Sequence, residues 1–268
     1  MPDTDDDLLD FAAYGLALPP GGIEGHVTHD GARIWYARYG SGKPVILLHG
    51  GLGHAGNWGK QVPALVAAGH QVVAIDSRGH GRSTRDARPF TYTRMTRDTR
   101  AVMDVLGLGK AALIGWSDGA CTALVLAGPI PERVAGVFFF ACNVDPSGTK
   151  KLDESDPLLG RCFSRHKQDY AALSPTPERF DALLADLGAM QKNQPNLSAA
   201  DLAAIRVPVW SVIGAQDEFI KHDHAAYIAA AIPGAHFREM PGVSHFAPLQ
   251  RPASFNATLL EFLSGLTW

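Results

Sequence analysis

The segment Gly115-Trp116-Ser117-Asp118-Gly119 constrains the fold of this chain more than any other. An apolar run, 111–114, precedes it, and a run compatible with a helix, 120–127, follows it. A strand that turns sharply into a helix exposes a serine hydroxyl on a strained turn, and the flanking glycines leave room for the neighbouring strand and helix. The pattern also fits an ordinary loop serine, so the case for a nucleophile depends on the rest of the chain.

Two later residues complete a candidate set for nucleophilic catalysis. A serine needs a histidine as general base and a carboxylate that holds this histidine. Asp217 follows the predicted buried strand 207–214, and His245 lies between a short late strand and the final helix. Alone, Asp217 would be better explained by a turn or a helix cap. The order serine, acid, histidine, each at a strand end, instead predicts a triad of Ser117, Asp217 and His245.

Several other candidates have simpler explanations. Glu218 is an alternative to Asp217 but fits the register less well, and Asp76 lies in a segment that we interpret mainly as a structural turn. Cys121 is expected to pack in the core. The His222-x-His224 pair lacks further ligands nearby, so we predict no metal site. No glycine-rich nucleotide fingerprint is complete, and we predict no cofactor.

Strands and helices alternate along most of the chain, which predicts an α/β fold with a doubly wound, mainly parallel sheet. Asp30-Gly31 predicts a hairpin near the start. The alternation breaks over 146–206, where helical stretches are expected near 179–190 and 198–205, and a structureless loop of this length is improbable. We therefore expect a tail at 1–22, a core of 23–145 and 207–268, and a helical cap at 146–206.

Five segments together resemble the α/β-hydrolase fold superfamily, in its esterase, lactonase and epoxide-hydrolase-like branch. They are His49-Gly50-Gly51 after an apolar strand, Asp76-Ser77-Arg78-Gly79-His80-Gly81, the segment around Ser117, Gly214-Ala215-Gln216-Asp217, and Ser244-His245-Phe246. The resemblance implies that the cap closes over the site. It also implies an oxyanion hole formed by the backbone N–H groups of Asp118 and of the segment after His49-Gly50, where we choose Gly51 because it lacks a side chain.

The turn around Ser117 also resembles that of valacyclovir-hydrolase-like enzymes, in which the acid beside the nucleophile helps to bind the amino group of amino-acid esters. The resemblance implies substrate contacts at Trp116 and Asp118. A negative charge is favourable at a helix N-terminus without any ligand, so Asp118 also has a purely structural explanation.

Composition narrows the function classes. The net charge of −3 argues against nucleic acid as a partner, and no apolar run approaches the length of a membrane span. An acidic N-terminal start and three cysteines without a C-x-x-C motif fit a cytoplasmic protein. We predict a small-molecule substrate and a carboxylic ester hydrolase. A lactonase, a carbon–carbon bond hydrolase, a cofactor-free lyase or peroxidase, and a non-catalytic binding protein on the same scaffold remain alternatives.

Overall fold

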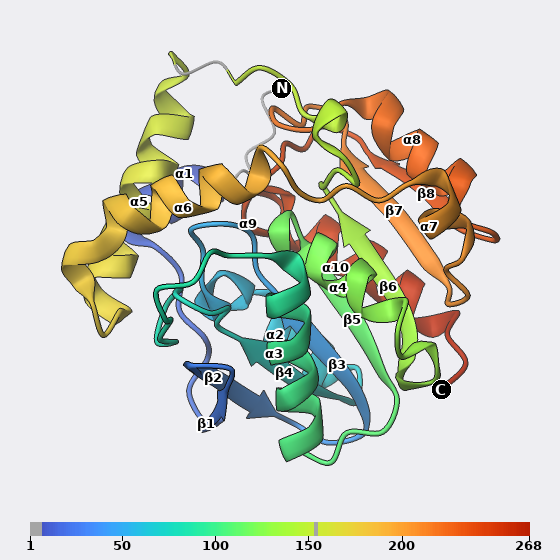
Figure 1. Cartoon of the computed structure of the whole chain (residues 1–268), viewed down its shortest axis with the longest axis horizontal. Helices are drawn as coiled ribbons and strands as arrows, with labels where there is room; N and C mark the ends of the chain where they lie inside the picture. The colour runs from blue at the N-terminus through green and yellow to red at the C-terminus, as the bar shows by residue number, and fades with distance from the viewer. Residues whose placement is uncertain (1–6, 153–154) are drawn as a thin grey trace.

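The computed structural model describes residues 7–152 and 155–268, which form one eight-stranded sheet between two layers of helices (Figure 1). Its strand order is β1-β2-β4-β3-β5-β6-β7-β8. β1 and β2 are antiparallel to their neighbours, and the other strands pair in parallel. The predicted α/β class with a mainly parallel sheet is therefore confirmed. The strands are β1 (Ile23–His29), β2 (Ala32–Tyr39), β3 (Lys43–Leu48), β4 (His70–Ile75), β5 (Ala111–Trp116), β6 (Val134–Phe140), β7 (Val209–Gly214) and β8 (His236–Met240).

Alternating side chains of the central strands separate the core into two layers, as expected for strands buried on both faces. Val45 and Leu47 of β3 pack with α2 and α10, whereas Ile46 and Leu48 pack with α3 and α4. The core helices are α2 (Gln61–Ala67), α3 (Tyr92–Val105), α4 (Asp118–Ala127), α8 (His222–Ala231), α9 (Ala247–Gln250) and α10 (Pro252–Ser264), with short 3₁₀ turns η1 (Ala55–Trp58) and η2 (Pro131–Arg133).

The predicted hairpin between β1 and β2 is present. Asp30 and Gly31 both have positive φ angles, 44° and 79°, and His29 pairs with Ala32 across the turn. Glycine adopts this backbone conformation freely and aspartate more readily than most residues, which explains why Asp-Gly is a hairpin signal.

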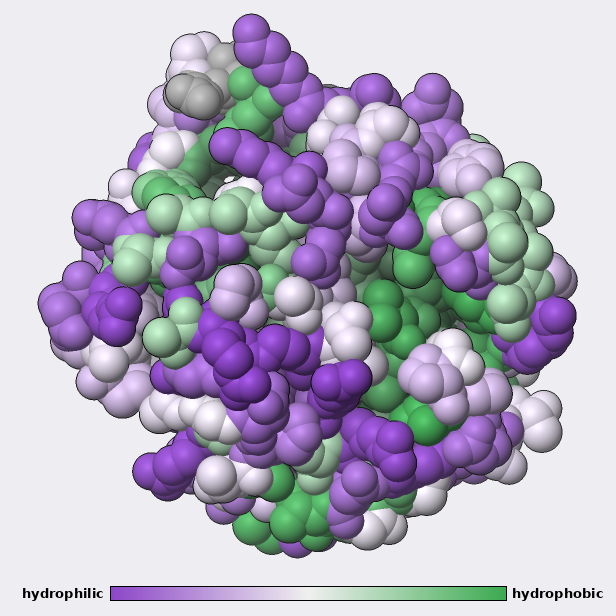
Figure 2. All heavy atoms as spheres, in the orientation of Figure 1, coloured by the Kyte–Doolittle hydropathy of each residue, from purple (hydrophilic) through white to green (hydrophobic). Residues whose placement is uncertain are grey.

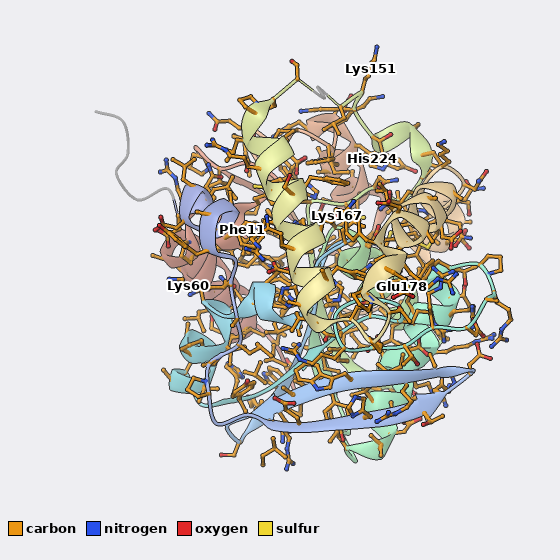
Figure 3. All side chains as sticks on the ribbon, turned by 90° about the vertical axis from the view of Figure 1, so that its left-hand side faces the viewer. Phe11, Lys60, Lys151, Lys167, Glu178 and His224 are labelled. Carbon is orange, nitrogen blue, oxygen red and sulfur yellow. The ribbon has the colours of Figure 1, made fainter. Side chains whose placement is uncertain are left out.

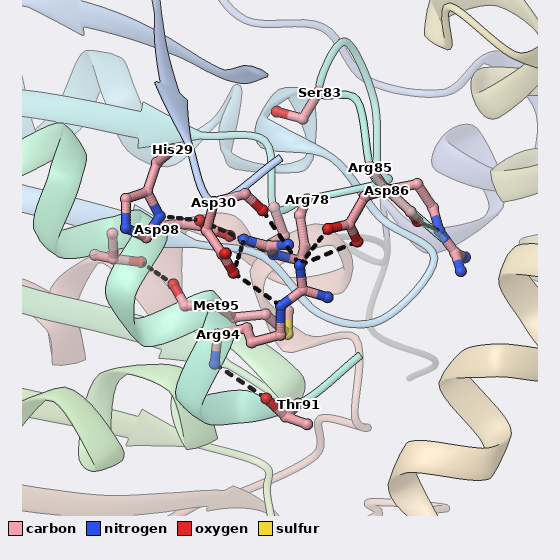
Figure 4. Close-up of polar contacts among 12 residues, drawn as sticks. His29, Asp30, Arg78, Ser83, Arg85, Asp86, Thr91, Arg94, Met95 and Asp98 are labelled. Carbon is pink, nitrogen blue, oxygen red and sulfur yellow. Dashed lines mark hydrogen bonds and ion pairs between the residues drawn. The ribbon is translucent and has the colours of Figure 1, made fainter. Parts of the chain in front are cut away.

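An ion-pair network joins this hairpin to α3 and to the loop that follows β4 (Figure 4). Asp30 accepts hydrogen bonds from Arg88 and Arg94, and the buried Arg78 donates to Asp98 through Nε (2.6 Å) and Nη2 (2.7 Å). A bidentate pair of this kind fixes orientation as well as contributing energy. The network therefore anchors the N-terminal end of α3 to the sheet.

The predicted tail at 1–22 contains a helix in its described part, and residues 1–6 of it lie outside the described residues. Leu8–Tyr14 forms helix α1, in which Leu8 and Phe11 are buried. The Asp7 N–H donates to the Gln250 carbonyl (2.8 Å), and Phe11 packs on His166 of α5. Two apolar side chains three residues apart were too weak a signal to predict this helix, which depends on burial against other elements.

Helices occupy the described part of the segment between β6 and β7. They are α5 (Pro157–Leu173), α6 (Phe180–Gln191) and α7 (Ala199–Ala203), with 3₁₀ turns η3 (Pro146–Gly148) and η4 (Pro177–Arg179). α6 and α7 correspond to the predicted helical stretches. α5 was not predicted, although Asp156 caps its N-terminus and Pro157 occupies its first position. We refer to 146–206 as the helical insertion.

In the space-filling view of the same face, mostly polar residues surround several apolar patches (Figure 2). Within the described residues, no helix combines the length and the apolar character needed to span a bilayer.

Candidate active site

Ser117 occupies the sharp turn between β5 and α4. Its φ angle is 53°, in a region that non-glycine residues rarely adopt. A Cβ on Gly115 would lie 2.3 Å from the Ala120 Cα, and one on Gly119 would lie 2.0 Å from the Leu48 carbonyl oxygen. The two glycines therefore permit the close approach of strand and helix. Backbone strain held in this way is typical of functional sites.

Asp217 and His245 are brought together from separate strand ends. Asp217 follows β7, His245 follows β8, and the His245 Nδ1 lies 3.0 Å from the Asp217 Oδ2. The other carboxylate oxygen of Asp217 accepts the backbone N–H groups of Phe219 and Ile220, at 2.8 Å each. Both side chains are almost completely buried. The carboxylate therefore has a fixed position against the imidazole.

The charge state of Asp217 follows from opposing effects. Burial raises the pKa of its carboxyl, but the neighbouring His245 and the hydrogen bonds from His245, Ile220 and Phe219 outweigh burial, so the pKa falls below its usual value. Asp217 is consequently ionised at neutral pH and can hold the imidazole Nδ1–H.

The two alternative acids make different contacts. Glu218 accepts the backbone N–H of His245 (2.9 Å) and does not bond the imidazole, and burial raises the pKa of its carboxyl. Asp76 accepts the backbone N–H groups of Ala55 and Arg82, at 2.6 and 2.8 Å. Asp76 thus ties together two loops, as expected for a structural residue.

Ser117 and His245 line one cavity of about 650 Å³ between the sheet and the helical insertion. Most of its wall is apolar or glycine, and α5 and α6 provide much of it. No Lys, Arg, Asp or Glu of the described residues lines it. The lining residues are Gly50, Gly51, Leu52, Gly53, Trp116, Ser117, Leu152, Leu159, Gly160, Phe163, His166, Leu184, Leu187, Gly188, Gln191, Phe219, His245 and Phe246.

Gly50 and Gly51 lie directly against the serine turn. A Cβ on Gly50 would be 3.2 Å from the Ser117 Cβ, and one on Gly51 would be 2.7 Å from the Asp118 Oδ2. Gly51 lines the cavity, as predicted for an oxyanion donor. Asp118 is the first residue of α4, so its N–H has no acceptor within the helix. Both predicted donors therefore lie beside Ser117.

His49 orients the glycine segment. The Ser77 N–H donates to the His49 Nε2 (3.0 Å), which leaves the Nδ1–H to donate to the Gly50 carbonyl (2.7 Å). Burial lowers the pKa of His49 to about 4, which keeps this neutral form at ordinary pH. Because a trans peptide directs its C=O and N–H oppositely, fixing the Gly50 carbonyl also fixes the Gly51 N–H. Sequence reasoning did not assign this role to His49.

The side chain of Asp118, predicted as a direct substrate contact, is engaged by two neighbouring side chains in this structure. Its carboxylate is buried and accepts hydrogen bonds from the Tyr92 hydroxyl (2.6 Å) and the Gln191 Nε2 (3.0 Å). Burial raises its pKa, although both hydrogen bonds oppose that shift. Gln191 lines the cavity and Asp118 does not, so recognition of a substrate amine by Asp118 would require Gln191 to move.

Of the other candidates, Trp116 lies in the cavity wall, whereas Cys121, His222 and His224 make structural contacts. Trp116 lines the cavity and packs on His245 with ring centroids 6.1 Å apart. Cys121 is buried and contacts the Asn143 carbonyl. The His224 Nε2 accepts the Val144 N–H (3.1 Å), and His222 pairs with Glu239. Among residues 7–152 and 155–268, no three potential metal-ligating side chains gather at one place.

Comparisons with known proteins agree with this architecture. Residues 43–157 match the family model described as alpha/beta hydrolase fold. The acetyltransferase component of the acetoin cleaving system of Cupriavidus necator is 31% identical, over 88% of this chain and 68% of that protein. The 2-hydroxy-6-oxo-6-phenylhexa-2,4-dienoate hydrolase of Burkholderia cepacia is 29% identical, over 87% of this chain and 92% of that protein.

A solved structure described as Est816, an N-acyl homoserine lactone degrading enzyme, superposes with a TM-score of 0.68 and is 27% identical, covering 89% of this chain and 100% of that one. The fold and the relatives define an enzyme built on the α/β-hydrolase scaffold. The chain belongs to the α/β-hydrolase family, and its activity is that of a hydrolase.

Proposed function

We propose that this enzyme hydrolyses uncharged, largely apolar carboxylic esters or lactones through Ser117, His245 and Asp217. The observation that carries the proposal is the hydrogen-bonded Asp217–His245 pair, with His245 and Ser117 in the wall of one cavity. Since the Nδ1–H of His245 is held by the carboxylate, its Nε2 is the atom available to accept the serine proton.

The reaction proceeds through an acyl-enzyme. The Ser117 Oγ forms a bond to the acyl carbon while its proton passes to His245. The backbone N–H groups of Gly51 and Asp118 stabilise the oxyanion, and the carbon–oxygen bond to the leaving group then breaks as that group takes the proton from His245. Water, deprotonated by His245, then attacks the acyl carbon; the bond from this carbon to the Ser117 Oγ breaks, the serine takes the proton back from His245, and the acid leaves. In a lactone, the acid and the alcohol belong to one product.

The cavity wall supports the choice of an uncharged substrate. A charged group that enters a low-dielectric cavity without a partner is strongly disfavoured. The wall has no Lys, Arg, Asp or Glu among the described residues, and the chain has eight Lys or Arg and eight Asp or Glu over 146–206. The helical insertion is therefore proposed to act as the cap that selects the substrate by shape and apolar contact.

Carbon–carbon bond hydrolysis is the second candidate, because the relative from Burkholderia cepacia is named as a hydrolase of a dienoate. A dienoate carries a carboxylate, and the described part of this cavity wall offers no cationic side chain to pair with it. We therefore rank this candidate below ester and lactone hydrolysis.

Turnover assays test the proposal. 4-Nitrophenyl esters of increasing chain length, γ- and δ-lactones, and a ring-fission dienoate are compared in the wild type and in Ser117→Ala. We expect the best ester or lactone to exceed the dienoate in kcat/KM by at least about tenfold, and Ser117→Ala to be inactive on all three classes. A preference for the dienoate, or full activity of Ser117→Ala, would contradict the proposal.

A further inference from the structure

The polar groups in the cavity wall contributed by the insertion are few. Within the described residues they are His166 of α5 and Gln191 of α6. The amide nitrogen of Gln191 already donates to Asp118, whereas no group of the described residues hydrogen-bonds the imidazole of His166. The Nδ1 of this imidazole is buried, so Nε2 is the nitrogen that the cavity can reach. His166 is only 6% exposed, so little solvent contacts it. An unpaired imidazole in the wall of a binding cavity points to a polar group that arrives with the ligand.

Three more buried atoms without hydrogen-bond partners belong to residues that interact electrostatically with His166. They are the His54 Nε2, the Arg165 Nε and the Asp169 Oδ2. The His54 Nε2 and the Asp169 Oδ2 are 3.5 Å apart, and the Arg165 Nη2 pairs with the Asp169 Oδ1 at 2.8 Å. Since the His54 Nδ1 accepts the Gly56 N–H, its Nε2 carries the hydrogen. A cluster of polar side chains that lack some of their hydrogen-bond partners therefore lies beside His166, between α5 and His54.

Figure 3 views α5 from outside, with Lys167 on the helix and Phe11 of α1 beside it. The exposed Lys167 pairs with Asp181, whereas its neighbour His166 packs on the Phe11 ring with centroids 5.5 Å apart. Phe11 of α1 thus covers one side of the His166 imidazole, while another part of this side chain lines the cavity.

We propose that His166 anchors an uncharged oxygen of the substrate, a carbonyl or a hydroxyl, that is separate from the bond to be cleaved. The proposal rests on the proposed function and adds to it: the preferred acyl or alkyl chain is not a plain hydrocarbon. A neutral imidazole both donates and accepts hydrogen bonds, so it matches either group. A carboxylate is disfavoured because Arg165 is already paired with Asp169 and does not line the cavity.

The charge state of His166 agrees with this assignment. Burial, followed by the neighbouring His54, lowers its pKa to about 4, although Asp169 opposes the shift. The groups around it are His54, His80, Arg165 and Asp169. His166 is therefore uncharged at neutral pH and suits an uncharged partner.

Matched esters test the anchor. The 4-nitrophenyl ester of octanoic acid is compared with its 5-oxo, 6-oxo and 7-oxo derivatives in the wild type, His166→Leu, His166→Gln and the apolar control Leu187→Ala. We expect one oxo isomer to exceed the parent in kcat/KM by about tenfold in the wild type. His166→Leu should abolish this preference, and His166→Gln should restore part of it because its amide nitrogen can replace Nε2. Leu187→Ala should lower both esters alike.

Two outcomes would overturn the anchor: no oxo isomer is preferred by the wild type, or the preference persists in His166→Leu. A binding measurement tests the anchor independently of ester hydrolysis. The affinity for octan-2-one is measured by tryptophan fluorescence, and His166→Leu should weaken it about tenfold even if no ester is hydrolysed. Unchanged ketone affinity would refute the anchor, whereas ketone binding without any ester hydrolysis would refute only the proposed reaction.

Discussion

The C-terminal edge of the sheet and the helical insertion form opposite walls of one cavity by different means. At the sheet edge, Asp217, His49 and Glu218 each hold a backbone group or another polar side chain by hydrogen bonds. The insertion contributes mainly apolar side chains, and Phe163 packs against Phe180, which packs against Tyr170. Hydrogen bonds fix atoms to within fractions of an ångström, whereas apolar packing tolerates exchange of side chains. We therefore expect residues at the sheet edge to determine the reaction class and residues of the insertion to determine the preferred substrate.

The largest expected effect lies at the sheet edge. His245→Ala should lower kcat by at least about 10³-fold, since the triad acts as a unit. Asp217→Asn should cause a comparable loss, because the amide no longer holds the imidazole in the productive tautomer. Glu218→Gln is the matched control: it keeps an oxygen for the His245 N–H and should lose less than about threefold. Equal losses in Asp217→Asn and Glu218→Gln, measured by steady-state kinetics, would make the assignment of the acid wrong.

A smaller effect is expected from His49→Leu, which removes the hydrogen bond that fixes the Gly50 carbonyl. Direct removal of one oxyanion donor costs about 10²–10³-fold in kcat. Since His49 acts through the peptide, we expect about 10–100-fold in kcat with KM little changed. A rise in KM at constant kcat would show that His49 shapes the binding surface and does not position a donor.

The insertion should respond differently. Phe163 lines the cavity, and the buried Phe180 supports it from behind. Phe163→Ala should change the ratio of kcat/KM between long-chain and short-chain esters several-fold. One methylene more or less in an apolar pocket can change kcat/KM by about tenfold. Labelling of Ser117 by a fluorophosphonate should stay within about twofold of the wild type. If chain-length preference is unaltered, the α5 wall does not determine specificity.

Acid titration compares one histidine from each region. Burial lowers the pKa of His80 to about 3 and that of His166 to about 4, from 6.5 when exposed. Below pH 6.5 these histidines bind protons in the unfolded chain but remain neutral in the folded chain. The free energy of unfolding therefore falls as the pH drops toward 4. His80→Leu and His166→Leu should each reduce that slope by up to about 1.4 kcal/mol per pH unit. Urea denaturation between pH 7.5 and 4.5 measures it, and an unchanged slope would contradict the burial of these histidines.

Sequence predicted the sheet edge better than the insertion. Gly115, Ser117 and Gly119 are local signals, because steric limits on a tight turn restrict residue type at fixed spacing. α5 and α1 depend on contacts with distant elements, which short-range patterns do not carry. Gln191 and Tyr92 were missed because their partner, Asp118, is 73 and 26 residues away. The spacing of Leu159, Phe163 and His166, at i, i+4 and i+7, was the available signal for the cavity face of α5.

Covalent labelling tests the central claim most directly. The wild type, Ser117→Ala and His245→Ala are treated with a fluorophosphonate, and the modified peptide is identified by mass spectrometry. The account predicts one adduct on Ser117 in the wild type, none in Ser117→Ala, and labelling at least about 10²-fold slower in His245→Ala, because the serine then lacks its base. An unlabelled wild-type enzyme, or an adduct on another residue that persists in Ser117→Ala, would contradict it.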